Sequence, residues 1–280
     1  MSWKIIVDSS CDLKQLNNLA PNTQYKNVPL TLKVGDHEFI DDENLDTKKM
    51  LAEMYAYEDR VTSSCPSPNA YLEAFEGADN IICMTISSKL SGSYNSCELA
   101  KSLYLENHPE ANIFVLDTLL CSGPISILAE QINQSIAKGL TFDEVVADLQ
   151  ANLEKSKIIF VLSSLDNLVK NGRVNHLVGK VVGLLNIRLI GQNNDGQIDM
   201  IHKARGQKKA LATVVSEMEK NNFNGGRVYL NHVDNLTGCQ LLEKLILDKF
   251  PTADITIEEA GGLCSFYAEE NGLLIGYQTK

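Results

Sequence analysis

The chain has 280 residues, of which 44% are hydrophobic and 22% charged, a composition that is ordinary for a soluble globular protein with a substantial core. Its formal net charge of −11 argues against a nucleic-acid surface, because neutralising phosphates needs clustered Lys and Arg. No apolar run approaches membrane-spanning length and no secretory signal pattern follows Met1, so we expect a cytoplasmic protein without a transmembrane segment.

The cysteines and histidines give no metal or disulfide signal. Seven cysteines are scattered singly, without a Cys-x-x-Cys pair, and the five histidines are equally dispersed. An odd cysteine count without paired spacing indicates reduced thiols rather than a disulfide framework or a zinc site. The sequence therefore predicts neither a metal nor a cofactor.

The first half of the chain alternates between strand-like and helix-like segments. Strands are expected at 3–7, 28–34, 80–86 and 111–117, and helices at 47–57, 69–75, 94–104 and 123–137. This alternation predicts right-handed βαβ crossovers and a mainly parallel sheet, in an α/β domain of residues 1–155.

Acidic residues follow two of these strands. The first strand ends in Asp8-Ser-Ser-Cys-Asp12, which delivers polar groups to the sheet edge where α/β proteins bind ligands. We interpret Asp12 as the cap of a short helix that follows, whereas Asp8 has no such simple explanation. The acidic run Asp41–Asp46 lacks a spaced set of oxygen ligands, so we expect a solvated turn there rather than a metal site.

The second half mixes strands with amphipathic helices. Strands are expected at 158–162, 187–190, 197–202, 227–232, 254–258 and 272–278, and helices at 141–153, 163–173, 175–185, 206–219 and 237–249. Thr141 and Glu144 stand in capping-box positions. Asn194-Asp-Gly196 is a hairpin signal, which indicates antiparallel pairing. We therefore predict a C-terminal α+β domain of residues 156–280.

The segment Ile81–Ser96 is the first candidate binding site. Its apolar strand runs into Ser87-Ser-Lys-Leu-Ser-Gly-Ser93 and then into a helix. The first turn of a helix leaves N–H groups without partners and carries a partial positive charge, so this junction suits an anion, with Gly92 allowing close approach. Capping by Ser91 or Ser93 is the simpler explanation for either serine alone, but the density of hydroxyls favours a ligand.

A second hydroxyl cluster lies in Val61-Thr-Ser-Ser-Cys-Pro-Ser-Pro68. Its two prolines exclude a regular helix or a central strand, so it is predicted to be a rigid polar loop. A helix start explains Ser67 but leaves Thr62, Ser63 and Ser64 without a role.

Several motifs in this order resemble the DegV family, bacterial proteins that bind fatty acids, over nearly the whole chain. They are Asp8-Ser-Ser-Cys-Asp-Leu13, Val28-Pro-Leu30, the loop Ser63–Pro68, Ser87-Ser-Lys-Leu-Ser-Gly-Ser-Tyr94, Leu165-x-x-Leu-Val-Lys-Asn-Gly-Arg173, Lys203-Ala-Arg-Gly-Gln-Lys-Lys-Ala210 and His232-Val-Asp-Asn235. The resemblance implies two α/β-type domains with one acyl chain buried between or within them.

The resemblance also implies which residues hold the acyl carboxylate. They are Ser91 and Ser63, with the neighbours of Ser63, Thr62 and Ser64, as alternatives. The amide of Gly92 and the hydroxyl of Ser93 are further donors. The expected ligand is a long-chain fatty acid such as palmitate or oleate.

By the same resemblance the chain is similar to the lipid-binding subunit of bacterial fatty acid kinase, which is no enzyme itself. It would present the acyl carboxylate to a separate ATP-using subunit that makes the acyl phosphate. Arg205 matches a motif that we assign to contact with that kinase, although a solvated helix start explains it equally. Arg173, just past Gly172, is placed either to contact helix carbonyls or to meet an anion.

The C-terminal region departs from the family pattern. Many members have Gly-x-His-x-Gly-Pro-Gly where this chain reads Ala260-Gly-Gly-Leu-Cys-Ser-Phe-Tyr-Ala-Glu-Glu-Asn-Gly272. Tyr267 then stands near the family histidine, where it either donates a hydrogen bond near the head group or packs in the core. The missing motif bears on kinase docking more than on lipid binding.

Two other functions fit the serine-rich helix start. A serine hydrolase would use Ser91 as nucleophile, but the Gly-x-Ser-x-Gly spacing is absent and no motif places a histidine beside it. A small-anion or phosphate-binding protein would use the same amides, although the Gly-x-x-x-x-Gly-Lys-Ser/Thr pattern of a P-loop is missing.

Overall fold

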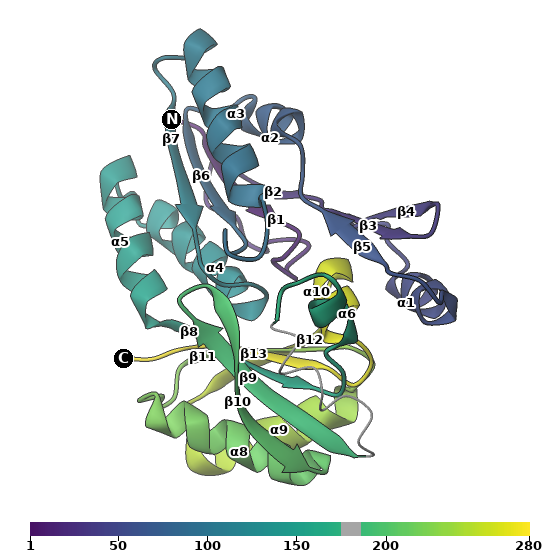
Figure 1. Ribbon diagram of the computed structural model, residues 1–280. Coiled ribbons are helices and arrows are strands. Elements are labelled where there is room, and N and C mark those ends of the chain that lie inside the picture. The colour runs from purple at the N-terminus through teal and green to yellow at the C-terminus, as the bar shows by residue number, and fades with distance from the viewer. Residues whose placement is uncertain (175–185) are drawn as a thin grey trace.

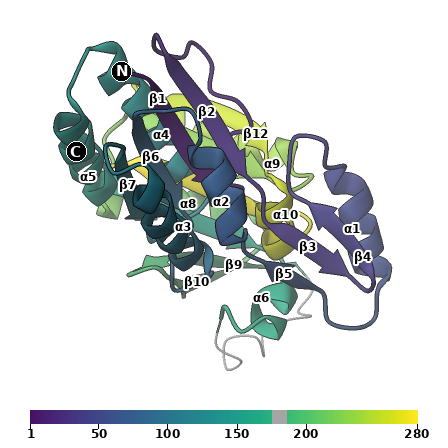
Figure 2. The same ribbon diagram turned by 90° about the horizontal axis from the view of Figure 1, so that it is seen from above.

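The computed structural model describes residues 1–174 and 186–280. Two large sheets lie one above the other, with a small three-stranded sheet beside them (Figure 1). The helix that we expected at 175–185 lies outside the described residues. Figure 2 shows the small sheet and its helix projecting to one side of the molecule.

The upper sheet is parallel and has the strand order β2-β1-β6-β7. Its elements are β1 (Trp3–Asp8), β2 (Thr23–Val28), β6 (Asn80–Thr85) and β7 (Asn112–Asp117). Every residue of β1 and β6 is buried, which explains their continuous apolar sequences. Helices α2 (Pro68–Phe75) and α3 (Ser93–Asn107) pack against one face. The prediction of a mainly parallel sheet is confirmed.

The lower sheet is mixed and has the order β10-β9-β8-β13-β11-β12. Its strands are β8 (Ser156–Leu162), β9 (Ile187–Asn194), β10 (Gln197–Arg205), β11 (Arg227–His232), β12 (Asp254–Glu259) and β13 (Leu273–Gln278). Only the pair β11–β12 is parallel among the pairs within the described residues. Helices α8 (Gln207–Lys220) and α9 (Leu236–Lys249) cover one face. The hairpin expected at Asn194-Asp-Gly196 joins β9 to β10.

Helix α4 (Gly123–Ala137) joins the two sheets, since it contacts β1 above and β8, β11 and β13 below. Two glycines permit this close approach. A Cβ on Gly123 would lie 2.6 Å from the Cβ of Tyr229, and one on Gly276 would lie 2.5 Å from Pro124. Helix α5 (Phe142–Lys155) follows, with the predicted capping box of Thr141 and Glu144.

The three-stranded antiparallel sheet was not expected from the sequence. It comprises β3 (Thr31–Val34), β4 (His37–Ile40) and β5 (Thr62–Ser64), in the order β4-β3-β5, and helix α1 (Thr47–Ala56) connects β4 to β5. The predicted polar loop at 61–68 is therefore partly an edge strand, which Pro66 and Pro68 end because proline cannot donate to the ladder.

Two expectations for the acidic residues were wrong. No helix follows Asp12; its carboxylate instead accepts a hydrogen bond from the backbone N–H of Gly261, 2.7 Å away. Asp41 is fully buried rather than solvated and accepts from the N–H groups of Gly262 and Leu263, each at 2.8 Å. Both carboxylates bind the start of helix α10 (Gly262–Ala268), an element that we did not predict.

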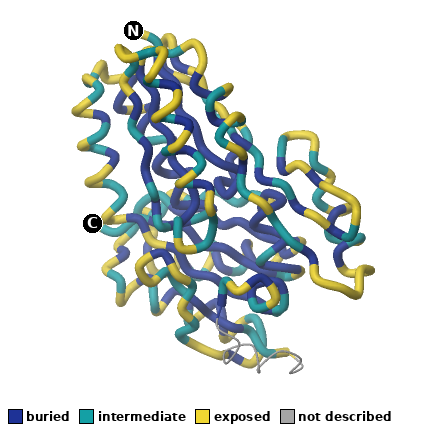
Figure 3. The backbone as a smooth tube through the Cα atoms, turned by 45° about the horizontal axis from the view of Figure 1, so that its top comes forward, coloured by how far each residue is buried: buried dark blue, intermediate teal, exposed yellow. Residues whose placement is uncertain are grey.

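One apolar core runs through both halves of the chain, because Trp3, Ile5 and Met84 belong to the same buried cluster as Phe160 and Leu274. Figure 3 shows buried backbone throughout the interior and exposed backbone on the outer helices. A domain boundary at residue 155 remains a prediction. Within the described ranges, no helix has the length and apolarity needed to cross a membrane.

Candidate functional site

A cavity of about 280 Å³ lies where the two large sheets, the small sheet and α10 meet. Most of its wall is apolar. The apolar lining residues are Leu30, Ile86, Leu90, Cys121, Phe160, Leu162, Leu168, Ile198, Leu263, Cys264, Ala268 and Leu274. They come from segments that are distant in the sequence, so the sequence alone did not predict that they line one cavity.

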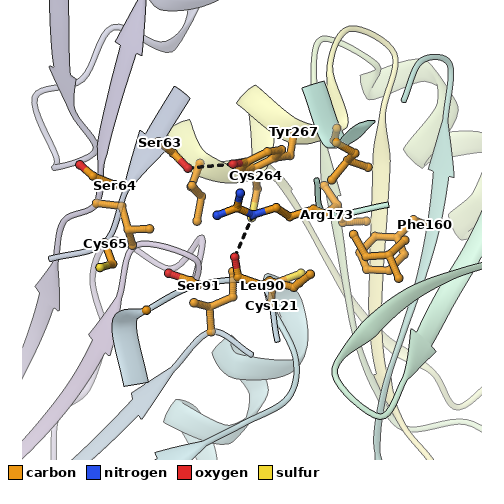
Figure 4. A pocket seen from close by; sticks show the side chains of 18 of the residues that line it. Ser63, Ser64, Cys65, Leu90, Ser91, Cys121, Phe160, Arg173, Cys264 and Tyr267 are labelled. Atoms are coloured by element: carbon orange, nitrogen blue, oxygen red, sulfur yellow. Dashed lines mark hydrogen bonds between the residues drawn. The ribbon is translucent and has the colours of Figure 1, made fainter. Parts of the chain in front are cut away.

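The polar groups of the cavity gather at one end. Ser63 and Ser64 come from β5, Ser91 and Gly92 from the start of α3, and Tyr267 from α10. Figure 4 shows Phe160 on the opposite side of the cavity from Ser64 and Ser91. The cavity therefore has an apolar body and a hydroxyl-rich end.

Ser63 and Tyr267 face each other across this polar end (Figure 4). Their hydroxyl oxygens are 2.8 Å apart, and either hydroxyl can be the donor. Ser63 is held in this position by β5, where it is paired with Leu32 of β3. Tyr267 thus lines the cavity at the polar end.

The start of α3 forms a second wall of the polar end. Gly92 is the N-cap residue and provides no side-chain cap, while the hydroxyl of Ser91 accepts a hydrogen bond from the N–H of Ser93 at 3.3 Å. A Cβ on Gly92 would lie 3.2 Å from the Cys65 sulfur, so glycine lets the two serine-bearing segments approach. N–H groups in such a first helical turn favour an anion.

Arg173 adds a positive charge at this end. Its side chain reaches into the space between Ser63 and Ser91 in Figure 4. The Nε atom donates to the carbonyl oxygen of Leu90 at 2.9 Å, and Nη1 donates to the carbonyl oxygen of Asn171. Within residues 1–174 and 186–280 no carboxylate forms an ion pair with Arg173. An anion in the cavity would therefore meet an uncompensated guanidinium.

Three other residues that the sequence singled out do not line this cavity. Ser93 is fully buried, and its hydroxyl donates to Asp8 at 2.5 Å and lies 2.6 Å from the Tyr71 hydroxyl. Thr62 is on β5 next to Ser63 but is not among the residues that line the cavity. Arg205 ends β10 and is exposed.

Asp8 explains how the serine loop is held. Its buried carboxylate accepts from the Ser10 hydroxyl at 2.5 Å, from Ser93 and from the N–H of Ile86 at 3.0 Å. Burial raises the pKa of Asp8, while these hydrogen bonds lower it. Asp8 therefore joins the end of β1 to both ends of the loop that carries Ser91.

Asp12 and Asp41 hold α10 and were missed as site-forming residues. Asp41 also pairs with Lys14 at 3.1 Å, and Asp12 accepts from the Ser122 hydroxyl. Burial raises the pKa of Asp12 to about 6. The pair Gly261-Gly262 was the sequence feature that could have indicated these contacts, because a glycine pair permits close approach of side chains to a helix start.

A second and larger hollow, about 630 Å³, lies between α4 and strands β11 and β12. Most of the residues that line it are polar, and its Arg227 is bound to Glu130 at 2.8 Å and to Asp254 at 3.4 Å. Among the described residues no group of three or more His, Cys, Asp or Glu could hold a metal, and no histidine lines the apolar cavity. We therefore regard the apolar cavity as the functional site.

The fold and site define an α/β protein with two large sheets and an apolar cavity that has a hydroxyl-rich end. The family profile described as "Uncharacterised protein, DegV family" matches residues 2–280. The chain therefore belongs to the DegV family.

Relatives with known sequences or structures agree with this assignment. A DegV domain-containing protein of Streptococcus pneumoniae is 49% identical over 279 residues, covering 99% of each chain. The crystal structure of the Streptococcus pneumoniae Fatty Acid Kinase (Fak) B3 protein loaded with linoleic acid is 49% identical, with a TM-score of 0.98 and 100% of both chains covered. A DegV family protein from Eubacterium eligens loaded with heptadecanoic acid is 35% identical, with a TM-score of 0.96 over 100% of both chains.

Proposed function

We propose that this protein binds a long-chain fatty acid in the apolar cavity, with its carboxylate at the end formed by Ser63, Ser91 and Tyr267. The observation that carries this proposal is the separation of an apolar wall from one hydroxyl-rich, positively charged end. The acids bound by the similar Fak B3 and Eubacterium eligens proteins support the same ligand class.

The energetics of such a site are favourable for both parts of the ligand. Each methylene buried in the apolar wall stabilises the complex by roughly 0.8 kcal/mol. The carboxylate needs compensating groups, because a buried charge without partners is strongly disfavoured. The hydroxyls of Ser63 and Ser91, the amide of Gly92 and the guanidinium of Arg173 provide such groups.

The other candidate donors take lesser roles in this proposal. Ser64 also lines the cavity, so it is the alternative donor from β5. Thr62 and Ser93 would act indirectly, since neither lines the cavity and the Ser93 hydroxyl is bound to Asp8. Palmitate and oleate are suitable probes because they differ only moderately in length and shape.

We further propose that the protein is a non-catalytic subunit that presents the carboxylate to an ATP-dependent kinase in the cytoplasm. The support is its similarity to the Fak B3 protein over the whole chain. Arg205 is exposed and lies in the basic stretch 203–209, where it would contact such a partner. Its test is acyl-phosphate formation when the protein, a fatty acid kinase subunit, ATP and oleate are combined, with the Arg205→Ala variant compared.

A serine hydrolase has weaker support. The Ser91 hydroxyl accepts from the N–H of Ser93, and within the described residues no histidine lines the cavity to activate it. Turnover of an acyl ester that disappears in Ser91→Ala would favour the hydrolase over our proposal.

The test of fatty-acid binding is organic extraction of protein purified from bacteria, followed by mass spectrometry. We expect one long-chain fatty acid per chain. A preparation that contains no lipid and takes up neither palmitate nor oleate would overturn the proposal. Inorganic phosphate that binds at the same site in place of lipid would favour a small-anion-binding protein.

A further inference from the structure

The polar end of the cavity is assembled from three separate segments, namely β5, the turn 88–92 before α3, and helix α10. A fourth segment touches all three. It is the short helix α6 (Asp166–Lys170) with the residues that follow it, of which Leu168 and Arg173 also line the cavity. Resting on the proposed function, we infer that Asn171 and Asn167 are positioning residues that set the spacing of the carboxylate-binding groups.

Asn171 fixes the β5 segment. The residue is 5% exposed, and its Nδ2 donates to the carbonyl oxygen of Val61 at 3.1 Å and to that of Asn167 at 2.9 Å. Oδ1 accepts from Arg60 at 3.3 Å. Val61 is two residues before Ser63, so the position of the Ser63 hydroxyl follows from this contact.

Asn167 fixes helix α10. It is 6% exposed, and its Nδ2 donates to the carbonyl oxygen of Phe266 at 2.8 Å. Its backbone N–H donates to Glu269 at 3.2 Å. These two contacts flank Tyr267, which they hold opposite Ser63.

The third contact comes from Arg173, whose Nε donates to the carbonyl oxygen of Leu90, the neighbour of Ser91. Asn167 and Asn171 are four residues apart and therefore lie on one side of the short helix. The side-chain bonds to Val61, Phe266 and Leu90 each end on a backbone carbonyl within two residues of a cavity-lining hydroxyl. A segment built in this way sets the distances between the hydroxyls without needing to touch the ligand.

Substitution of these asparagines should weaken recognition of the carboxylate specifically, rather than binding of the whole ligand. Replacing Asn171 with leucine keeps the size of the side chain but removes the donor to Val61. The apolar wall is unchanged, so binding of the hydrocarbon chain should persist. Recognition of the carboxylate should fall, because it requires several groups at set distances. We therefore use the ratio of the affinities for a fatty acid and for the alcohol of equal chain length.

The experiment measures both affinities by displacement of a fluorescent fatty acid from the full-length protein. Wild type should prefer palmitate over hexadecanol, and Asn171→Leu should lose about ten-fold of that preference while its affinity for hexadecanol changes less than about two-fold. Asn167→Leu should give the same pattern. If Asn171→Leu does not fold, the smaller and uncharged Asn171→Ser takes its place.

Asn133 provides a matched control. It is 8% exposed, its Nδ2 donates to the carbonyl oxygen of Asn18 at 3.0 Å, and its Oδ1 accepts from the N–H of Ala20 at 2.8 Å; none of these three residues lines the cavity. Asn133→Leu should lower thermal stability but keep the preference for palmitate.

Two results would overturn the inference. One is an unchanged preference in the Asn171 and Asn167 variants; the other is an equal loss of affinity for acid and alcohol, which indicates a purely structural role. A wild-type protein that binds no fluorescent fatty acid, or that does not prefer the acid, would instead overturn the proposed function. The measurements on the wild-type protein therefore distinguish failure of the proposed function from failure of the inference about Asn167 and Asn171.

Discussion

The hydroxyl oxygens of Ser63 and Tyr267 lie 2.8 Å apart at the polar end of the cavity, although 204 residues separate the two side chains in the sequence. Each hydroxyl has one proton to donate. When one proton is used between the pair, the other remains for a ligand oxygen. The pair thus joins β5 to α10 and still offers a donor to a carboxylate.

Removing the tyrosine hydroxyl should weaken binding of the fatty acid without changing the shape of the cavity. For Tyr267→Phe we expect a loss of roughly ten-fold or more in affinity for palmitate, because a hydrogen bond to a charged group contributes about 1.5–3 kcal/mol. Isothermal titration calorimetry on delipidated protein measures this. Ser63→Ala should have a similar effect, and the two losses should not add, since the hydroxyls act as a pair.

Tyr94→Phe is the control for this prediction, because Tyr94 is on α3 outside the cavity lining. Its affinity for palmitate should stay at the wild-type value. Wild-type affinity in Tyr267→Phe would mean that the carboxylate lies elsewhere.

The far end of the cavity should set the length of the bound chain. A small void of about 10 Å³ lies beyond Phe160 and Ile198, under the β9–β10 hairpin at Gly196. Phe160→Leu should join this void to the cavity and shift the preference towards longer acids. Two further buried methylenes are worth roughly 1.6 kcal/mol, or about ten-fold in relative affinity.

Competition between acids of 16 and 18 carbons checks this shift. Phe223→Leu is the matched control, because Phe223 is equally buried but packs on the other face of the lower sheet. An unchanged preference in Phe160→Leu would show that the chain ends before this ring.

Asp12 should make stability depend on pH in the acid range. Burial raises its pKa from the usual 3.8 to about 6, so between these values the folded protein binds more protons than the unfolded chain. The free energy of unfolding contributed by this group therefore falls as the pH rises from about 4 to 6 and is lowest above 6. At about 1.4 kcal/mol per unit, the change is up to roughly 3 kcal/mol.

Asp12→Asn removes the titrating group while its amide can still bond to Gly261 and Ser122. Urea denaturation at pH 4, 5, 6 and 7 should give a difference between variant and wild type that increases in favour of the variant as the pH rises. A difference that stays constant over this range would contradict the prediction.

The contact between α4 and the lower sheet should not tolerate a methyl group. In Gly276→Ala the new Cβ would lie 2.5 Å from Pro124 and 2.7 Å from the carbonyl carbon of Gly123, both parts of rigid backbone or ring. We expect a loss of roughly 1–3 kcal/mol in the free energy of unfolding. Gly226→Ala, whose nearest neighbour is 3.9 Å away, should stay within about 0.5 kcal/mol of wild type. Equal stabilities of the two variants would contradict the tight contact.

The sequence predicted the regular elements better than the small ones. Continuous apolar runs identified β1, β6 and β8, and the hairpin signal at Asn194-Asp-Gly196 identified the β9–β10 turn. The three-stranded sheet was missed because its strands have three or four residues each, too few for an alternating pattern to be recognised. Helix α10 was missed because its cap comes from the distant Asp12 and Asp41.

The serine clusters of the candidate site could be singled out from the sequence. Which of the serines line the cavity, and which bind elsewhere in the protein, could not be predicted. Ser63 and Ser91 line the cavity, whereas Ser93, two residues further on, is directed to the buried Asp8. That difference depends on the direction of each side chain after folding. The apolar wall was also invisible, because residues such as Phe160 and Leu274 look like ordinary core residues until the sheets are assembled.

The most direct test of the account is ¹³C NMR of the protein loaded with palmitate labelled at the carboxyl carbon. We predict one bound carboxylate resonance, distinct from free palmitate, that moves in Tyr267→Phe and Ser91→Ala and stays in place in Tyr94→Phe. Absence of a bound resonance, or a resonance that neither cavity substitution moves, would contradict a carboxylate held at this end of the cavity.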